Sequence, residues 1–141
     1  MTSEEMARSH LRLAQRILAE AERLHRDGAW NLVVRRCQES VEMALKSLLR
    51  SAGAEVPKVH DVSGALRRNA NRLPATAATE IDFLVSASRR LREEREIAFY
   101  GDEETTTGAE TLFSESDAED ALGTARRVLA VCTGPDQAVQ P

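Results

Sequence analysis

A long amphipathic stretch near the start of the chain constrains the fold more than any other feature. Between Gly28 and Gly53, apolar residues recur at alternating intervals of four and three. This spacing predicts a long helix packed in a bundle. We expect Gly53 to end the helix, because glycine adopts the left-handed conformation after a last turn without steric cost. Glu42 and Lys46 stand four residues apart and can pair along the helix surface. The members of the apolar stripe are Trp30, Val34, Cys37, Val41, Ala44 and Leu48.

A first helix is predicted to precede this stretch. Thr2, followed three residues later by Glu5, matches a capping box, so the helix begins at Thr2 or Ser3 and runs to about Asp27. Since only Gly28 separates the two helices, they should form an antiparallel hairpin. The predicted inward face of the first helix comprises Met6, Leu13, Ile17, Ala21 and Leu24.

Two further helices are predicted after Gly53. Asp61 has the position of an N-cap for a short helix over about 62–70, which ends before Pro74. A fourth helix should run from about Ala75 to Ala98. Its apolar seam comprises Ile81, Leu84, Leu91 and Ala98.

The end of the chain predicts a loop, a last helix and a tail. Residues 101–110 are acidic and rich in threonine, so we expect a mobile loop. Ser116 and Glu119 form a second capping-box pattern at the start of the last helix, and Gly134 ends it before a tail over 134–141. The buried stripe of this helix is Ala118, Leu122, Ala125, Val128, Leu129 and Cys132. No strand pattern appears, so the predicted fold is all-α: an up-and-down four-helix bundle with an additional short helix, in one domain over residues 1–133.

Composition narrows the classes of function. A net charge of −4 argues against a general affinity for nucleic acid. The chain has no run of about 18 apolar residues and a polar start, so we expect a cytosolic protein without a membrane span. Cys37 and Cys132 both fall on helical apolar stripes, which predicts buried thiols in a reducing compartment rather than a disulfide.

Motifs for metal, phosphate or nucleophilic chemistry are missing from the sequence. Histidines and cysteines are scattered, without His-Glu-x-x-His or Cys-x-x-Cys spacing. The glycines form no phosphate-binding loop. We therefore expect no metal and no cofactor.

Arg95 departs most clearly from the pattern. It falls on the apolar seam of the predicted fourth helix. An arginine there must be paired, or must face a cleft or another subunit, because an isolated charge is costly to bury.

The order of motifs along the chain resembles the HEPN domains, small helical bundles of prokaryotic toxin–antitoxin and RNA-processing systems. The long helix is similar to their second helix, and Arg95, within REIAFYGD, matches an arginine at the end of their fourth helix. The resemblance places His60 and Asp61 in a loop, where a structural role is expected for the histidine. The matching positions are Cys37-Gln38, Val41-Glu42, Ala44-Leu45-Lys46 and Leu48-Leu49, followed by Gly53, Pro57 and His60-Asp61.

The resemblance implies one specific chemistry, which is metal-independent RNA cleavage. Catalytic HEPN domains pair such an arginine with a histidine after four to six intervening residues, across a dimer. Here the corresponding positions hold Tyr100, Gly101 and Asp102. Tyrosine is a poor base near neutral pH. Pairing with Arg95 would lower the pKa of Asp102 and make it a weaker base than a free aspartate. The candidate site is thus Arg95, Tyr100 and Asp102, without the histidine.

We therefore expect association rather than catalysis. The resemblance implies a non-catalytic or weakly catalytic member of a toxin–antitoxin or regulatory pair, with a minimal nucleotidyltransferase as partner. A homodimer would bring Arg95 and Tyr100 of two subunits together. One alternative is a metal-independent RNA endonuclease that uses Arg95 with Tyr100 or Asp102. Another is RNA or nucleotide binding without cleavage, through Arg67, Arg68, Arg72 and Arg95.

Overall fold

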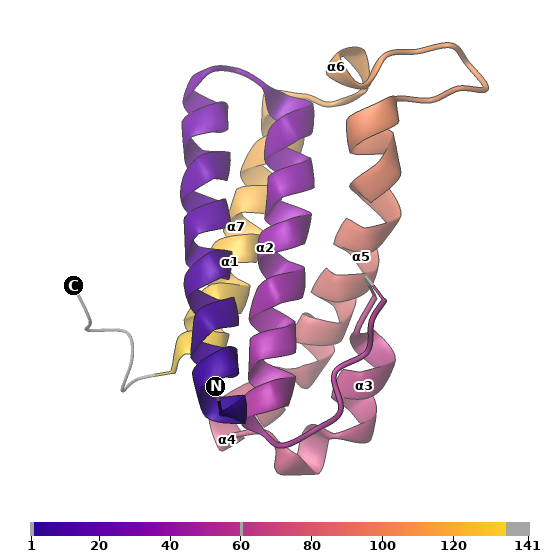
Figure 1. Ribbon diagram of the computed structural model, residues 1–141. Helices are drawn as coiled ribbons and strands as arrows, with labels where there is room; N and C mark the ends of the chain where they lie inside the picture. The colour runs from indigo at the N-terminus through magenta and orange to yellow at the C-terminus, as the bar shows by residue number, and fades with distance from the viewer. Residues whose placement is uncertain (1, 60, 135–141) are drawn as a thin grey trace.

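Four long helices form the bundle in the computed structural model, which describes residues 2–59 and 61–134. Three short helices and one 3-10 segment connect them, and no strand occurs within these described ranges (Figure 1). The all-α prediction is confirmed, with more short helices than the single one expected. The long helices are α1 (Ser3–Arg26), α2 (Trp30–Ser51), α5 (Ile81–Tyr100) and α7 (Glu115–Thr133). The short segments are α3 (Ser63–Arg68), η1 (Ala70–Arg72), α4 (Ala75–Ala78) and α6 (Ala109–Leu112).

Helix α2 is the centre of the bundle. It packs against α1, α5 and α7, and Figure 1 shows it between α1 and α5 with α7 behind. Contact on three sides explains why α2 buries more residues than one stripe provides. Besides most of the predicted stripe, it buries Val33, Gln38, Ser40, Leu45, Ser47 and Leu49.

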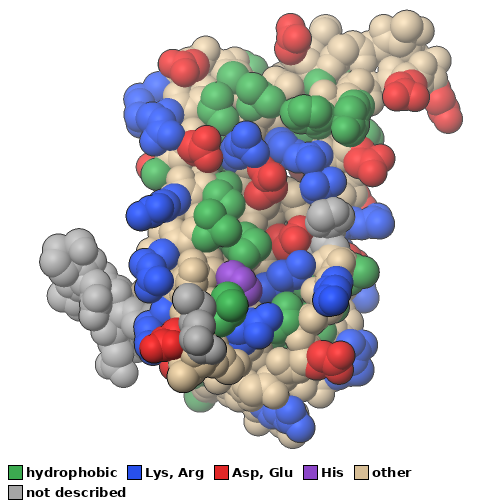
Figure 2. Space-filling view, in the orientation of Figure 1, with side chains coloured by type: hydrophobic (Ala, Val, Ile, Leu, Met, Phe, Trp, Pro, Cys, Tyr) green, Lys and Arg blue, Asp and Glu red, His purple; other side chains and the backbone are tan. Residues whose placement is uncertain are grey.

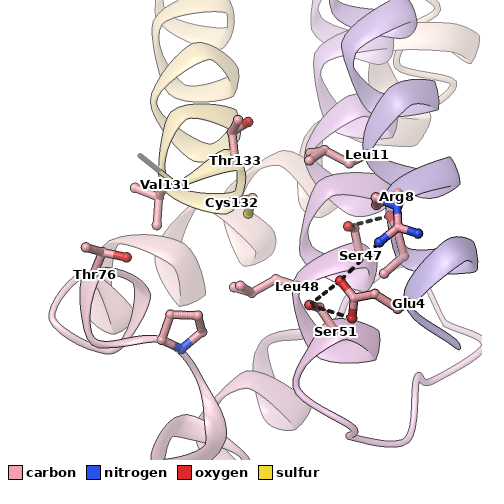
Figure 3. Close-up of a pocket in the computed structure, with 13 residues that line it drawn as sticks. Glu4, Arg8, Leu11, Ser47, Leu48, Ser51, Thr76, Val131, Cys132 and Thr133 are labelled. Atoms are coloured by element: carbon pink, nitrogen blue, oxygen red, sulfur yellow. Dashed lines mark hydrogen bonds and ion pairs between the residues drawn. The ribbon is translucent and has the colours of Figure 1, made fainter. Parts of the chain in front are cut away.

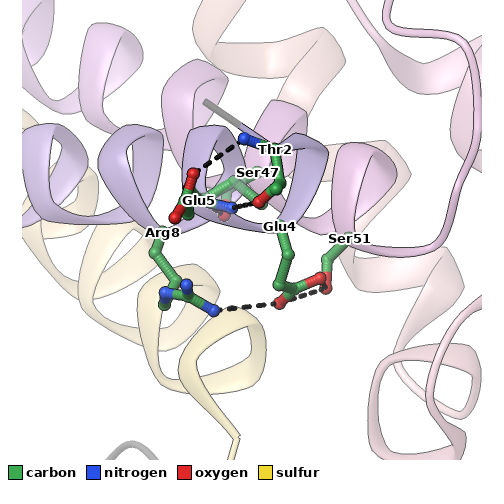
Figure 4. Close-up of polar contacts among 7 residues, drawn as sticks. Thr2, Glu4, Glu5, Arg8, Ser47 and Ser51 are labelled. Atoms are coloured by element: carbon green, nitrogen blue, oxygen red, sulfur yellow. Dashed lines mark hydrogen bonds and ion pairs between the residues drawn. The ribbon is translucent and has the colours of Figure 1, made fainter.

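Helix α1 begins as predicted but turns a different face inward. The Glu5 amide donates to the Thr2 hydroxyl at 3.1 Å, and the Thr2 amide donates to the Glu5 carboxylate at 2.7 Å (Figure 4). The predicted inward face is wrong in part, since Leu13 is 44% exposed. The buried residues are Ala7, Leu11, Ala14 and Ala21.

These alanines allow α2 to approach α1 closely. The Ser40 hydroxyl donates to the Ala14 carbonyl at 2.7 Å, and the Ser47 hydroxyl donates to the Ala7 carbonyl at 2.7 Å. From Ser40 to Ser47 the chain advances seven residues along α2, while their partners move back seven residues along α1, from Ala14 to Ala7. The two bonds therefore fix the same antiparallel register. Bulkier side chains at these two contacts would hold the helices apart, which is why Ala7 and Ala14, and not Leu13, face α2 there.

Gly53 ends α2 as predicted. Its φ is 76°, the Ala54 amide donates to the Leu49 carbonyl at 3.0 Å, and the Gly53 amide donates to the Arg50 carbonyl at 3.1 Å. This pair of bonds is a Schellman cap, which satisfies carbonyls that the end of the helix leaves open.

The predicted fourth helix is interrupted. Helix α4 ends at Ala78, and α5 begins at Ile81. The Thr79 hydroxyl donates to the Thr76 carbonyl at 3.1 Å, and Arg127 of α7 pairs with Glu80 at 2.6 Å. Tertiary contact at the break thus outweighs the helix propensity of an alanine-rich segment.

The third helix is also shorter than predicted, because α3 ends at Arg68 and η1 follows. Asp61 is not the N-cap that was predicted, because Val62 holds that position without a side-chain cap bond, but Asp61 still contacts the start of α3. Its carboxylate accepts the Ser63 amide at 2.9 Å and the Ser88 hydroxyl of α5 at 3.2 Å. Burial works against the charged form of Asp61, but its hydrogen bonds to Ser63 and Ser88 lower the pKa overall.

Helix α7 begins with a different capping box from the one predicted. The Asp117 amide donates to the Ser114 hydroxyl at 3.3 Å, and the Ser114 amide donates to the Asp117 carboxylate at 2.8 Å. Ser116 and Glu119 lie inside the helix instead. The predicted stripe is buried from Ala118 to Leu129, whereas Cys132 is only partly buried.

Both cysteines are free, in agreement with the prediction that they form no disulfide. In the described parts of the chain, no helix combines the length and apolar character that a bilayer crossing needs.

Candidate interaction site at the end of α5

Arg95 lies on the side of α5 that faces α2, as its place on the seam predicts. Its neighbours on that seam, Leu91 and Ala98, are buried. The Arg95 Nε donates to Oε1 of Gln38 at 3.1 Å. Gln38 is 1% exposed, so the guanidinium is anchored in the bundle rather than free in solvent.

A chain of polar contacts continues from Gln38 along α2. The Gln38 Nε2 donates to Glu42 Oε1 at 3.0 Å, and Lys46 pairs with Glu42 Oε2 at 3.0 Å. The predicted pair of Glu42 and Lys46 is confirmed. The two side chains are only 14% and 15% exposed, so they are less hydrated than a surface pair. The amide of Gln38 therefore links the Arg95 cation to a carboxylate on α2.

Two side chains of α2 hold the last turns of α5. Arg35 Nη1 donates to the Arg95 carbonyl at 3.0 Å, and Asn31 Nδ2 donates to the Ala98 carbonyl at 3.0 Å. Carbonyls at a helix C-terminus lack helical partners and carry partial negative charge. The donors from α2 satisfy one such carbonyl and place a cation beside this end.

Exposed apolar side chains gather at the same end of α5. Ile97 is 45% exposed, Phe99 52% and Tyr100 66%. The rings of Phe99 and Tyr100 meet edge to face at 5.0 Å, and the Arg35 guanidinium lies 5.1 Å from the Phe99 ring centroid. We call Ile97, Phe99, Tyr100 and Arg35 the α5-end patch. Figure 2 shows hydrophobic side chains beside Lys and Arg side chains in this part of the molecule.

The candidate site residues do not converge within one chain. Positions 95 and 100 differ by five residues, which places their side chains about 140° apart around the helix. Asp102 follows α5, and its carboxylate accepts the amides of Glu104 at 3.0 Å and Thr105 at 3.4 Å. Asp102 therefore shapes a turn, and no hydrogen bond or ion pair among the described residues joins it to Arg95.

The segment after α5, predicted as a mobile loop, contains a tight hairpin. Asp102 and Thr107 exchange backbone hydrogen bonds at 2.9 and 3.0 Å. Gly101 is buried and has a φ of 78°, and a Cβ there would lie 2.4 Å from the Thr107 carbonyl oxygen. Position 101 consequently has no room for the histidine of the catalytic pattern. The mobility of this segment stays a prediction.

The arginines of the RNA-binding alternative lie apart. Arg67 pairs with Asp82 near the start of α5 at 2.7 Å. Asp82 precedes Arg95 by 13 residues, which corresponds to about 20 Å along the helix. Arg68 and Arg72 lie on α3 and η1. The four arginines thus form no single cluster, and His60 lies outside the described residues.

The surface has two hollows large enough to be candidate binding sites. One, of about 290 Å³, lies along the last turns of α5 and is lined by Arg92, Glu93, Arg95, Glu96 and Ile97. It adjoins the α5-end patch and is lined almost entirely by charged side chains.

The other hollow, of about 220 Å³, opens at the opposite end of the bundle between α1, α2, α4 and α7 (Figure 3). Glu4 lies 3.9 Å from Arg8 and 3.4 Å from the Ser51 hydroxyl at its edge (Figures 3 and 4). Cys132 also lines it, but burial raises the pKa of this thiol to about 12. The thiol stays protonated near neutral pH and is a poor nucleophile.

The sequence identified Arg95 but not its partners. Gln38 falls next to Cys37 in the apolar stripe of α2. This position could have indicated a buried polar side chain available to pair with Arg95. Asn31, Arg35 and Phe99 act at the end of α5 through contacts between segments about 60 residues apart, which helical periodicity does not report.

Comparisons with known proteins agree with this fold. The family model described as HEPN domain matches residues 7–134. Among solved structures, the crystal structure of TT1696 from Thermus thermophilus is similar, with a TM-score of 0.75 and 26% sequence identity. The alignment covers 89% of this chain and 94% of TT1696. No curated protein matches the sequence. The chain belongs to the HEPN domain family.

Proposed function

We propose that this HEPN protein acts by association through the α5-end patch. The observation that carries this proposal is the exposure of Ile97, Phe99 and Tyr100, by 45%, 52% and 66%, at one end of one helix. Isolated exposed apolar residues are ordinary on protein surfaces, but a group with two aromatic rings and an arginine is typical of interface centres.

The geometry supports association better than RNA cleavage. Cleavage needs an acid, a base and a cation around one phosphate. In this chain Arg95 donates a hydrogen bond to Gln38, and the Asp102 carboxylate accepts a backbone amide of the turn that follows it. Position 101 has no space for a side chain. A second subunit would have to supply or rearrange these groups before the endonuclease alternative gained a working site.

A symmetric homodimer is the simplest form of this association. In such a dimer the same patch meets itself, so Phe99 and Tyr100 of both subunits would bury their rings together. A heterologous partner is the second part of the proposal. The family resemblance supports a minimal nucleotidyltransferase, with the pair acting in a toxin–antitoxin or regulatory role.

Sedimentation tests the dimer. We expect wild type to be dimeric at micromolar concentration and the double variant Phe99→Ser, Tyr100→Ser to dissociate at least tenfold more readily. Leu13→Ser is a matched control, because Leu13 is a comparably exposed apolar residue on α1. A monomeric wild type, or equal weakening in the control, would show that the patch is not a homodimer contact.

The partner needs its own experiment. Co-expression with a minimal nucleotidyltransferase encoded beside this protein should give a complex that survives gel filtration. The same double variant should shift the complex toward its free components, whereas Leu13→Ser should not. Recovery of no complex with wild type would contradict the nucleotidyltransferase proposal and leave the homodimer to be judged by sedimentation.

An RNA assay separates the two alternatives from association. A structured RNA pool is incubated in a metal chelator with wild type and with Arg95→Ala, and cleavage and binding are measured together. Association predicts neither. Cleavage that the variant loses would support the endonuclease, and an affinity without cleavage that falls steeply with salt would support RNA binding.

A further inference from the structure

We propose that His25, Glu115 and Glu119 form a binding site for a divalent transition metal ion such as Zn²⁺. His25 lies in the last turn of α1, and the two glutamates lie four residues apart in the first turns of α7. Their spacing puts both carboxylates on one face of α7, where the end of α1 meets it. The site is separate from the α5-end patch and does not rest on the proposed function.

The distances fit one shared ion after small side-chain movements. One ligand atom from each residue lies within 4.8 Å of the others. Three atoms with these separations can all lie within about 2.8 Å of a common point. Zinc binds nitrogen and carboxylate oxygen at about 2.0 to 2.2 Å, so each atom must move by less than about 1 Å. Both glutamates are exposed and can make this movement without disturbing the core.

The imidazole of His25 has an unsatisfied nitrogen directed to this place. Its Nε2 is shielded from solvent and has no hydrogen-bond partner among the described residues. The nearest carboxylate oxygen, Glu119 Oε1, is 3.9 Å away, which is too long for a hydrogen bond. A shielded polar atom without a partner is costly. An ion held between the imidazole and the carboxylates would satisfy it.

The donor set selects the chemical class of the ion. One imidazole and two carboxylates suit Zn²⁺ and its first-row neighbours, whereas Mg²⁺ and Ca²⁺ prefer oxygen ligands alone. Three protein ligands also leave a position for water or a further ligand. Sequence spacing could not reveal this set, because His25 and Glu115 are 90 positions apart and meet only when α1 packs on α7.

Trp30 makes the proposal easy to test. It is the only tryptophan of the chain, and its ring centroid lies 5.3 Å from that of His25. Untagged, chelator-treated protein is titrated with Co²⁺, which should quench Trp30 fluorescence in a saturable manner. Calorimetry with Zn²⁺ gives stoichiometry and affinity independently of the fluorophore.

We expect one Zn²⁺ per chain with micromolar affinity. Each of His25→Ala, Glu115→Gln and Glu119→Gln should weaken binding at least tenfold in calorimetry. The controls His10→Ala and Glu110→Gln change the same residue types elsewhere and should bind as wild type does. At a free Zn²⁺ concentration about 100 times Kd, the Tm should rise by roughly 5–10 °C, because the ion binds only the folded chain.

Two results would overturn the proposal. The first is the lack of saturable binding to wild type, which would leave His25 and Glu119 as an ion pair only. The second is undiminished binding in all three ligand variants, which would place the ion elsewhere. Circular dichroism of each variant establishes that it is folded, and the isosteric glutamine changes keep the test valid if His25→Ala is unstable.

Discussion

The Arg95 guanidinium donates to the side-chain oxygen of Gln38 at 3.1 Å, across the contact between α5 and α2. Gln38 is 1% exposed, and its side-chain amide donates a hydrogen bond to the Glu42 carboxylate at 3.0 Å. Arg95 is tolerated on the bundle seam because the Gln38 amide oxygen accepts its hydrogen bond. The amide nitrogen of the same side chain donates to the Glu42 carboxylate. Both ends of that amide are therefore satisfied at the centre of the contact.

The first prediction concerns this amide. Gln38→Leu removes the acceptor of Arg95 and one donor to Glu42 while keeping an apolar side chain of similar size. We expect the free energy of unfolding to fall by about 1–3 kcal/mol, the usual cost of a polar group left without its partner. Urea denaturation at neutral pH measures the change.

Arg95→Leu and the double variant complete a cycle with Gln38→Leu. If the two side chains stabilise the bundle through their mutual bond, the double variant should lose less stability than the two single changes combined, by about 0.5–3 kcal/mol. Additive losses would mean that the bond contributes nothing, and that each residue acts through other contacts.

The second prediction concerns the hairpin after α5. Gly101→Ala would place a Cβ 2.4 Å from the Thr107 carbonyl oxygen and 2.9 Å from the Ala109 amide, at a φ of 78°. We expect a loss of roughly 1–3 kcal/mol in unfolding free energy, because backbone must move to relieve the clash. Thermal denaturation measures it.

Gly123→Ala is the matched control for that change. Gly123 lies within α7, and a Cβ there would meet nothing within 4 Å. Alanine is the better helix former, so this variant should gain about 0.5–1 kcal/mol. Equal effects of the two substitutions would show that the close approach at Gly101 does not constrain the hairpin.

Elements with strong local signals were predicted well from the sequence. The stripe of α2, the capping box at Thr2 and the left-handed Gly53 all depend on residues within a few positions of one another. The inward face of α1 was not predicted well. Ala7 and Ala14 are buried there in place of Leu13 because α2 approaches α1 closely. The break before α5 likewise depends on α7.

The sequence predicted only the part of the candidate site that follows from the periodicity of a single helix. Periodicity placed Arg95 on the seam of its helix, and this is confirmed. It could not show that Gln38 would be its acceptor or that Asp102 would accept two amides of a turn. Those relationships arise when segments distant in sequence pack together, or from a turn whose residues carry no helical pattern.

The third prediction concerns the serines between α1 and α2. Ser40→Ala and Ser47→Ala each remove a buried hydroxyl that donates at 2.7 Å to a carbonyl of α1. Each change should cost about 0.5–1.5 kcal/mol, and the costs should add because the sites are about 10 Å apart along α2. Ser86→Ala, on the exposed side of α5, should be close to neutral in the same urea titration.

The last prediction concerns pH. Burial raises the pKa of the Cys37 and Cys132 thiols to about 12, whereas a thiol in an unfolded chain ionises near pH 8.5. Between about pH 9 and 12 the folded chain therefore holds protons that the unfolded chain has released. Stability contributed by these thiols is complete below pH 8.5 and falls as pH rises, by at most about 1.4 kcal/mol per pH unit for each cysteine.

The double variant Cys37→Ala, Cys132→Ala separates this effect from other groups that titrate in alkali. It should be less stable than wild type at pH 8, because the buried sulfur of Cys37 and the partly buried sulfur of Cys132 both lose their packing contacts. Between pH 8 and 10.5 its unfolding free energy should decline less steeply than that of wild type, measured by urea titration under a reductant. Parallel declines would mean that the folded bundle lets its thiols ionise as readily as the unfolded chain does, and that neither cysteine is shielded as its burial indicates.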